Sequence, residues 1–315
     1  AQGDGDGRRP AGALPASGVR GGLLEERAVG LLIAFIKALP HRVAVAFGGL
    51  LGHLLWLLSW KKVDRCERRC VQALGVGVTL ARGIVRRSFA NLGRSAAEFV
   101  RLDRIKPRLQ ELVAIEGTEN LDRALARGHG ALLMVAHMGN WEMAGARVVQ
   151  AGYPLVPIYT PQRNRGGLND LIQRRRTRAA GMTMIPSEGG GLRGVFRALG
   201  QNGIVCILQD LDARADGVVV PFLGMPASAH EGIVKLFRRF GAPVVPVLCV
   251  RAPDGIHHRV VFQEVLSDEV DEDGNSFGFN MEKSLRMCHN VLEEWVLTYP
   301  DQWLWLLDRW ESTMR

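Results

Sequence analysis

From about residue 112 onward, short apolar runs alternate with longer amphipathic segments, and this alternation limits the possible folds more than any other feature. The apolar runs predict strands at 112–115, 131–135, 155–159, 183–185, 204–208, 218–220, 244–250 and 259–262. The amphipathic segments predict helices at 119–127, 141–150, 167–179, 190–201, 229–240 and 280–298. Strands that alternate with helices favour an α/β fold with a mixed, mostly parallel central sheet covered by helices.

The amino-terminal part of the chain has a different character. Residues 1–22 are rich in Gly, Ala, Pro and Arg and are predicted to form a disordered leader. Residues 23–60 hold two apolar stretches separated by Pro40 and are predicted to form a helical membrane anchor. Residues 61–315 are then predicted to form the main domain, and their first part, 62–102, is predicted to form amphipathic helices.

The second apolar stretch, 43–60, carries no formal charge and is close to the minimum length of a spanning helix. Lys61 and Lys62 follow it and would lie on the cytoplasmic side of a membrane. Three glycines, Gly48, Gly49 and Gly52, allow a second helix to pack closely against it. A spanning helix, a hairpin packed on the soluble domain and a partly inserted monotopic hairpin all remain open, and we favour the last.

A histidine and a carboxylate follow the predicted strand at 131–135. His137 stands at the carboxyl end of this strand, where open α/β sheets bind their ligands, and Glu142 comes five positions later. A histidine held by a carboxylate can take a proton from an alcohol while the carboxylate fixes its tautomer. We therefore predict that His137 is a general base oriented by Glu142, which suits acyl transfer to a hydroxyl. The alternative is a structural histidine.

Other residues are predicted to complete this site. Backbone amides near Gly139 and Asn140, at the start of a predicted helix, can stabilise an oxyanion. Asp210 follows the predicted strand at 204–208 and is expected to orient an arginine or a substrate hydroxyl, or to cap a turn. Segment 221–227 has the turn residues and apolar character expected of a loop lining an acyl channel. No Gly-x-Ser-x-Gly sequence is present, which disfavours a covalent acyl-enzyme.

The motif from His137 to Glu142 occurs among several segments in a fixed order. These are EGTENL at 116–121, QD at 209–210, VPFLGMPA at 220–227, NVLEEW at 290–295 and YPDQWLW at 299–305. Together they resemble the bacterial lipid A biosynthesis acyltransferases, the lauroyl/myristoyl group of the lysophospholipid acyltransferase superfamily, across about residues 25–312. That superfamily is marked by a His-x4-Asp/Glu motif, and this chain carries the glutamate form.

The resemblance implies a similar α/β fold and an O-acyltransferase. The enzyme would move a fatty acyl chain from acyl carrier protein or coenzyme A to a hydroxyl of a lipid A precursor. No metal is expected, nor any cofactor besides the thioester donor. Two other readings remain open: an acyltransferase for another phosphoglycolipid such as a phosphatidylinositol mannoside, and a catalytically silent lipid-binding protein.

One position departs from the family pattern. Members usually carry Tyr-Arg-Pro where this chain has Thr160 in place of the arginine, which serves the acceptor phosphate or the active site. Arg163 or Arg165 in the following loop is predicted to substitute for it. Arg175, in a run of arginines on a predicted helix, is also predicted to bind phosphate. With Asn140 and Asp210, these three arginines form the predicted substrate-binding set.

The formal net charge of +8 predicts attraction to anionic partners. Nucleic acid is not expected, since zinc-finger spacing, a helix-turn-helix signal and an RNP-like aromatic pattern are all missing. An acyl carrier protein or CoA thioester, an anionic glycolipid and inner-membrane lipids fit better, which predicts a place on the cytoplasmic face of the cell inner membrane. Five cysteines argue against a disulfide scaffold, and Cys66 and Cys70 are expected to be packing or surface thiols in a reducing compartment.

Overall fold

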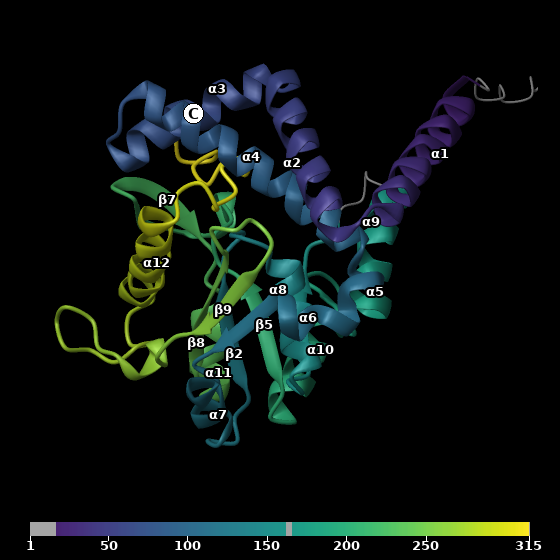
Figure 1. The fold of residues 1–315 in the computed structure, drawn as a ribbon. Helices are drawn as coiled ribbons and strands as arrows, with labels where there is room; N and C mark the ends of the chain where they lie inside the picture. The colour runs from purple at the N-terminus through teal and green to yellow at the C-terminus, as the bar shows by residue number, and fades with distance from the viewer. Residues whose placement is uncertain (1–16, 162–165, 315) are drawn as a thin grey trace, which may run out of the picture.

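A computed structural model of the chain describes residues 17–161 and 166–314. Four amino-terminal helices form a layer above an α/β unit, and the first of them projects away from the rest of the molecule (Figure 1). These helices are α1 Ser17–Ala38, α2 His41–Leu58, α3 Trp60–Leu74 and α4 Val78–Val100. Because α1 begins at Ser17, the last part of the predicted leader, 17–22, is helical. The helix extends back from the apolar run into these residues, because each residue added to an existing helix forms one more backbone hydrogen bond. Residues 1–16 of the predicted leader lie outside the described residues.

The central sheet has seven strands in the order β1-β9-β8-β2-β5-β3-β4. Its strands are β1 Val113–Glu116, β2 Ala131–Val135, β3 Leu155–Tyr159, β4 Ile185–Pro186, β5 Ile204–Leu208, β8 Val244–Arg251 and β9 His258–Phe262. Strands β8 and β9 pair antiparallel, and the other neighbours in this sheet pair parallel. The predicted mixed, mostly parallel sheet is therefore confirmed, and β2, β3 and β5 have the predicted bounds.

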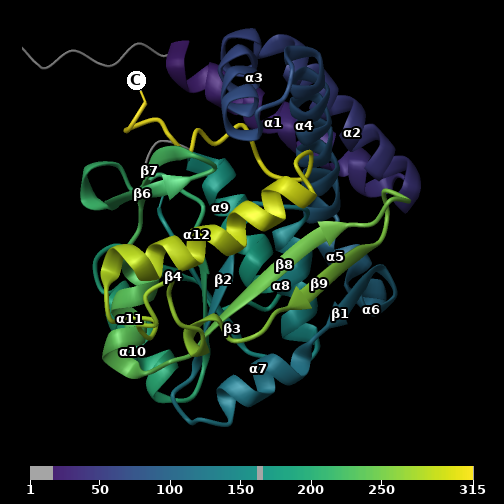
Figure 2. The same cartoon turned by 90° about the vertical axis from the view of Figure 1, so that its left-hand side faces the viewer.

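Helices cover both faces of this sheet, as Figure 2 shows. They are α5 Leu102–Ile105, α6 Leu109–Leu112, α7 Thr118–Leu125, α8 Trp141–Gln150, α9 Gly166–Arg174, α10 Gly191–Gly200, α11 Gly232–Phe240 and α12 Met281–Thr298. A π-helical turn, η2 Arg175–Ala179, continues α9, and short 3-10 turns lie at η1 Lys106–Arg108, η3 Arg214–Asp216 and η4 Leu266–Asp268. One buried cluster joins α8 to the sheet, and a second joins α10, α11 and α12 to its other face.

A β-hairpin replaces the loop that we predicted to line an acyl channel. Strands β6 Val218–Phe222 and β7 Met225–Ala229 pair antiparallel, and the tight turn between them contains Leu223 and Gly224, both at positive φ. The predictions of a loop at 221–227 and of a helix from 229 are wrong, since α11 begins only at Gly232. Pro221 and Pro226 hid the strands, because proline lowers the strand signal except at edges. The two prolines face each other in the hairpin.

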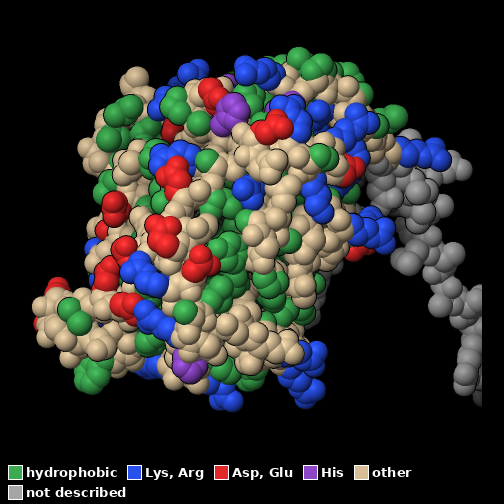
Figure 3. Space-filling view, turned by 60° about the horizontal axis from the view of Figure 1, so that its bottom comes forward, with side chains coloured by type: hydrophobic (Ala, Val, Ile, Leu, Met, Phe, Trp, Pro, Cys, Tyr) green, Lys and Arg blue, Asp and Glu red, His purple; other side chains and the backbone are tan. Residues whose placement is uncertain are grey.

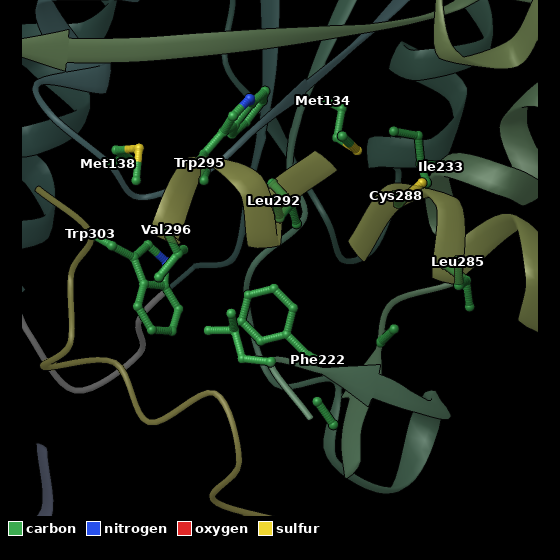
Figure 4. Packing of buried hydrophobic residues seen from close by; sticks show 14 of the residues in the cluster. Met134, Met138, Phe222, Ile233, Leu285, Cys288, Leu292, Trp295, Val296 and Trp303 are labelled. Carbon is green, nitrogen blue, oxygen red and sulfur yellow. The ribbon is translucent and has the colours of Figure 1, made fainter. Parts of the chain in front are cut away.

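The three carboxyl-terminal tryptophans belong to the protein core. Trp303, Trp305 and Trp310 are all buried, and the ring centroids of Trp303 and Trp305 are 4.7 Å apart. Figure 4 shows Trp303 and Phe222 of the hairpin on the same side of α12. Cys66 is buried beside them, and its Sγ donates to the carbonyl of Trp305 at 3.2 Å. These tryptophans therefore pack in the protein core and are not exposed as an interfacial belt would be.

Helix α2 is long and apolar enough to cross a membrane, judged by length and composition alone, and 28% of it is buried. Its buried stripe is made of small residues. A Cβ added to Gly48 would lie 2.5 Å from the carbonyl oxygen of Gly93 in α4, and one added to Gly52 would lie 2.1 Å from the carbonyl oxygen of Phe89. The expectation that these glycines allow close helix packing is confirmed. The opposite side of α2 exposes Leu50 and Leu57. The contact of this side with membrane lipid stays a prediction.

Candidate active site

His137 lies at the carboxyl edge of the sheet, two residues after β2 ends. A tight turn follows it, in which Gly139 has φ +59° and lies against the next strand. A Cβ at this position would come within 2.4 Å of the carbonyl oxygen of Cys249, so only glycine fits. The backbone carbonyl of His137 accepts a hydrogen bond from Leu304 N at 3.0 Å. The turn is therefore fixed from both sides, and the imidazole is largely buried, with 14% of its side chain exposed.

The carboxylate that orients His137 is Asp210, which follows the neighbouring strand β5. Its Oδ1 lies 2.8 Å from Nδ1 of the imidazole, and its Oδ2 accepts from the backbone N–H of His137 at 2.8 Å. An ionised carboxylate only accepts hydrogen bonds, so Nδ1 carries the proton. In the neutral ring this leaves Nε2 with a free lone pair. That is the tautomer a general base needs.

Asp210 is held ionised by its surroundings. It is 3% exposed, and burial by itself raises the pKa of this carboxyl. Attraction to His137, together with the hydrogen bonds donated by His137 and by the indole of Trp303, outweighs burial and keeps the pKa below its ordinary value. The Trp303 Nε1 to Asp210 Oδ2 distance is 2.9 Å. The carboxyl-terminal segment therefore contributes directly to the His137–Asp210 pair.

Glu142 has a different partner from the one predicted. Its carboxylate accepts from Nε of Arg176 at 3.0 Å to each oxygen and from the indole of Trp141 at 3.2 Å. In this structure Asp210 takes the place beside His137 that we predicted for Glu142, and a part for Glu142 in catalysis stays a prediction. Glu142 stands in the first turn of α8 and reaches across to the π-helical turn η2, whereas Asp210 follows β5, the strand that pairs with β2 before His137. Arg176 thus pairs with Glu142, and both line the same cavity as His137, described below.

The predicted substrate-binding residues are scattered. Asn140 is buried: its Oδ1 caps α8 by accepting from Met143 N at 3.1 Å, and its amide donates to Glu98 at 2.7 Å. Arg175 pairs with Asp103 at 3.0 Å and does not line the cavity described below. Arg163 and Arg165 lie outside the described residues.

Sequence reasoning chose Arg175 over Arg176 in the run of arginines, and it missed the role of Trp303 and the pairing of His137 with Asp210. One signal for the pairing was available, since both residues follow the ends of strands that a parallel sheet can place side by side. The sequence could not show which arginine of the run faces the cavity, because a π-helical turn rotates the side chains relative to an α-helix.

An apolar cavity of about 570 Å³ opens beside the histidine. His137, Glu142 and Arg176 contribute to its wall, while the remaining wall comes mainly from apolar side chains of the central sheet, α8, α10 and α11. Lys235 and Arg239 of α11 add two basic side chains to the cavity. Cys206 also lines it, but burial raises the pKa of this thiol to about 12, so it is not a nucleophile at neutral pH. The volume lies within the roughly 300–1,000 Å³ usual for small-molecule pockets. A base beside an apolar cavity suits a reaction on a substrate with a hydrocarbon chain.

A family model for bacterial lipid A biosynthesis acyltransferases matches residues 27–312. The chain belongs to this family. A phosphatidylinositol mannoside acyltransferase of Mycobacterium tuberculosis is 32% identical over 51% of this chain and 52% of its own length. The Mycolicibacterium smegmatis protein of the same name is 28% identical over 72% of each chain. A lipid A biosynthesis palmitoleoyltransferase of Escherichia coli is 26% identical over 65% of this chain and 63% of its own length. The family therefore joins proteins named for two kinds of glycolipid.

Proposed function

We propose that this protein is an O-acyltransferase that moves a fatty acyl chain from a thioester donor to a hydroxyl of a phosphate-bearing glycolipid. The observation that carries the proposal is the His137–Asp210 pair at the wall of an apolar cavity. In its neutral form His137 presents a lone pair on Nε2, and the cavity offers a place for the chain that the donor carries. Membership in an acyltransferase family supports the same reaction.

The reaction proceeds in two steps. Nε2 of His137 takes the proton of the acceptor hydroxyl as its oxygen attacks the thioester carbonyl, which gives a tetrahedral oxyanion. When this intermediate collapses, the carbon–sulfur bond breaks, and the leaving thiolate takes the proton from the imidazolium. Asp210 stabilises the imidazolium between the two steps. A thioester is already activated, so positioning and proton transfer supply much of the rate.

The Arg176–Glu142 pair has a separate role in this proposal. Arg176 and His137 line the same cavity, and Glu142 fixes the guanidinium of Arg176 through two oxygens. We assign to Arg176 the place that the family arginine would take at Thr160. It would bind an acceptor phosphate, for which a planar guanidinium has matching donors. Thr160 itself is exposed, and its hydroxyl contacts Ser187 Oγ at 3.2 Å.

Two phosphate-bearing glycolipids are candidates for the acceptor. The sequence favoured a lipid A precursor, and the Escherichia coli relatives support it. The mycobacterial relatives support a phosphatidylinositol mannoside, and one of them aligns over a larger share of both chains. Both acceptors carry phosphate, and the net charge of +8 suits both these lipids and an acidic acyl carrier protein. On the face in Figure 3, acidic and basic side chains are interspersed, so the excess charge is not gathered in one basic patch there.

The decisive experiment incubates purified protein with acyl carrier protein or coenzyme A thioesters and a panel of lipids, and resolves the products by mass. We expect acylation of a phosphoglycolipid, and a loss of about 10²–10⁴-fold in rate for His137→Ala. Acylation of only the mannoside or only the lipid A precursor decides the acceptor. If the folded protein acylates none of the lipids with either donor, the lipid-binding alternative replaces the enzyme.

We also propose that the protein acts on the cytoplasmic face of the cell inner membrane, bound through α2. The support is the exposed apolar side of this helix, which includes Leu50, Leu54 and Leu57. Replacing these three leucines with asparagine should weaken binding to anionic vesicles and leave the fold intact, because they are exposed. Undiminished binding that high salt removes would instead make the basic surface the main anchor.

A further inference from the structure

Helix α4 carries a buried polar stripe on the side that faces the catalytic turn. Ser88, Asn91, Ser95 and Glu98 are spaced three or four residues apart, so they share one face of the helix. All four are buried. Most surface helices bury apolar side chains, so a buried polar face of this length requires partners for each of its members.

The partners of this stripe lie at the active site. Ser88 Oγ donates to the carbonyl of Trp303 at 2.5 Å, and Asn91 donates to the carbonyl of Asp301 at 3.0 Å. Ser95 Oγ donates to the carbonyl of Gly139 at 3.1 Å. The stripe therefore contacts both segments that enclose His137: the turn after β2 and the carboxyl-terminal segment that supplies the indole to Asp210.

Glu98 has the most partners in the stripe. Its side chain is fully buried, and it accepts from Asn140 Nδ2 at 2.7 Å, from Arg251 at 2.7 and 2.9 Å, and from His258 Nε2 at 3.1 Å. Burial raises the pKa of this carboxyl, but His258 and Arg251 outweigh it and lower the pKa to about 2. Glu98 is therefore a fixed negative charge whose oxygens are all engaged.

The contact with Asn140 links this charge to the catalytic turn. The side-chain amide of Asn140 makes two hydrogen bonds: its oxygen caps α8, and its nitrogen donates to Glu98. The opposite side of α4 packs on α2 through glycines too close for any side chain. The turn that holds His137 is thus attached to a helix that has no room to shift toward α2.

We propose that Glu98 is a positioning residue for the catalytic turn, acting on His137 through Asn140. The idea rests on the proposed function, because the position of His137 matters only if it takes a proton. Displacing a catalytic group by about 1 Å can cost roughly 100-fold in rate without any loss of binding. A purely structural ion pair would instead change only the stability of the fold.

The variant that separates these two roles is Asn140→Ser. Serine is a good helix N-cap, so α8 keeps its cap while the donor to Glu98 is lost. The contacts of Glu98 with Arg251 and His258 remain, which should keep the variant folded. We expect kcat to fall about tenfold, with KM for the thioester changed by less than about threefold. Hydrogen exchange of segment 137–143 should become faster.

Glu98→Gln and the double variant complete the test. If Glu98 acts through Asn140, the loss of kcat in the double variant should be clearly smaller than the product of the two single losses. Leu121→Ala, a buried change in α7, serves as the stability control: it should lower the melting temperature and leave the kcat of the folded protein unchanged.

Three outcomes decide the matter. Unchanged kcat and unchanged exchange of segment 137–143 in Asn140→Ser would overturn the positioning role, whatever the melting temperature does. If Glu98→Gln fails to fold, Asn140→Ser alone decides. If the wild-type protein acylates no lipid, the proposed function fails, and the exchange measurement by itself shows whether Glu98 fixes the turn.

Discussion

Replacing Asp210 with asparagine should abolish catalysis while keeping the shape of the site. Oδ2 of Asp210 accepts from two N–H groups, the backbone of His137 and the indole of Trp303. The amide oxygen of an asparagine must take this place, because an NH₂ group there would face two donors. The NH₂ group then faces Nδ1 of His137, which must present a lone pair. The proton moves to Nε2, and the base is lost.

The expected magnitude follows from this change of tautomer. The equivalent aspartate-to-asparagine change in a serine-protease triad lowers kcat about 10⁴-fold, which corresponds to about 5.4 kcal/mol of transition-state stabilisation. Here the histidine deprotonates an acceptor hydroxyl toward an activated thioester, and general-base catalysis contributes roughly 10²–10⁴-fold. We therefore expect Asp210→Asn to lower kcat by at least about 100-fold, with KM for the donor little changed.

The assay follows release of the donor thiol at saturating thioester and acceptor. Asp212→Asn is the matched control: Asp212 stands two residues away and binds Ser312, at 2.7 Å from both its backbone N–H and its hydroxyl. It should keep kcat within about twofold. Glu142→Gln tests the competing assignment. If Asp210→Asn keeps more than a tenth of the rate while Glu142→Gln loses 100-fold, the orienting role of Asp210 is refuted.

Three further predictions concern the cavity, the indole donor and pH. Gly145→Ala should shift donor preference to acyl chains about two methylenes shorter, because a Cβ there would lie 2.4 Å from Cε of Met182 in the cavity wall. The ratio of kcat/KM for the shorter to the longer donor should rise roughly fifteen-fold. Gly200→Ala, whose Cβ would meet nothing within 4 Å, is the control. Trp303→Phe removes a donor to the carboxylate of Asp210 and should lower kcat about tenfold, as steady-state kinetics can show. Burial and a neighbouring arginine lower the pKa of His289 from 6.5 to about 3, so the unfolded chain binds the additional proton. This contribution to stability is present above pH 6.5 and is lost as pH falls toward 3, by up to about 1.4 kcal/mol per pH unit; urea titrations of wild type and His289→Gln at pH 7 and 5.5 should differ in this slope.

The sequence predicts well which strands and helix carry the site, because the spacing of apolar residues and the turn residues are local signals. Strands β2, β3 and β5 and helix α8 begin and end where the apolar pattern places them. His137 reaches the carboxyl edge of the sheet for the same reason, since it follows a buried run bounded by glycine. A parallel sheet gathers such strand ends at one edge, so the location of the site follows from the fold class.

The partners of each side chain could not be predicted in the same way. Glu142 follows His137 closely in sequence, but it belongs to a helix that turns its first residues toward η2, and its partner Arg176 is distant in the sequence. Glu98 binds groups 42 to 160 positions away. Contacts at this separation depend on how elements pack, and a single sequence carries no signal for them.

The structure gives His137 and the cavity arginine Arg176 separate carboxylate partners, whereas sequence reasoning had paired Glu142 with His137 and assigned phosphate to other arginines. Asp210 is buried, its pKa is held below the ordinary value, and its carboxylate accepts from His137 and from the indole of Trp303. Glu142 holds Arg176 in the cavity wall. The side chain of Arg176 is 20% exposed and so accessible to a substrate anion. A single carboxylate could not do both, because an arginine bound to the same oxygens would compete with the imidazolium for its charge. Separate carboxylates let the proton-transfer step and the recognition of phosphate be altered independently. Arg176→Lys should therefore raise KM for the phosphorylated acceptor by about tenfold while kcat at saturation changes little. An equal loss in kcat, measured with the same acceptor, would show instead that Arg176 acts in the transition state.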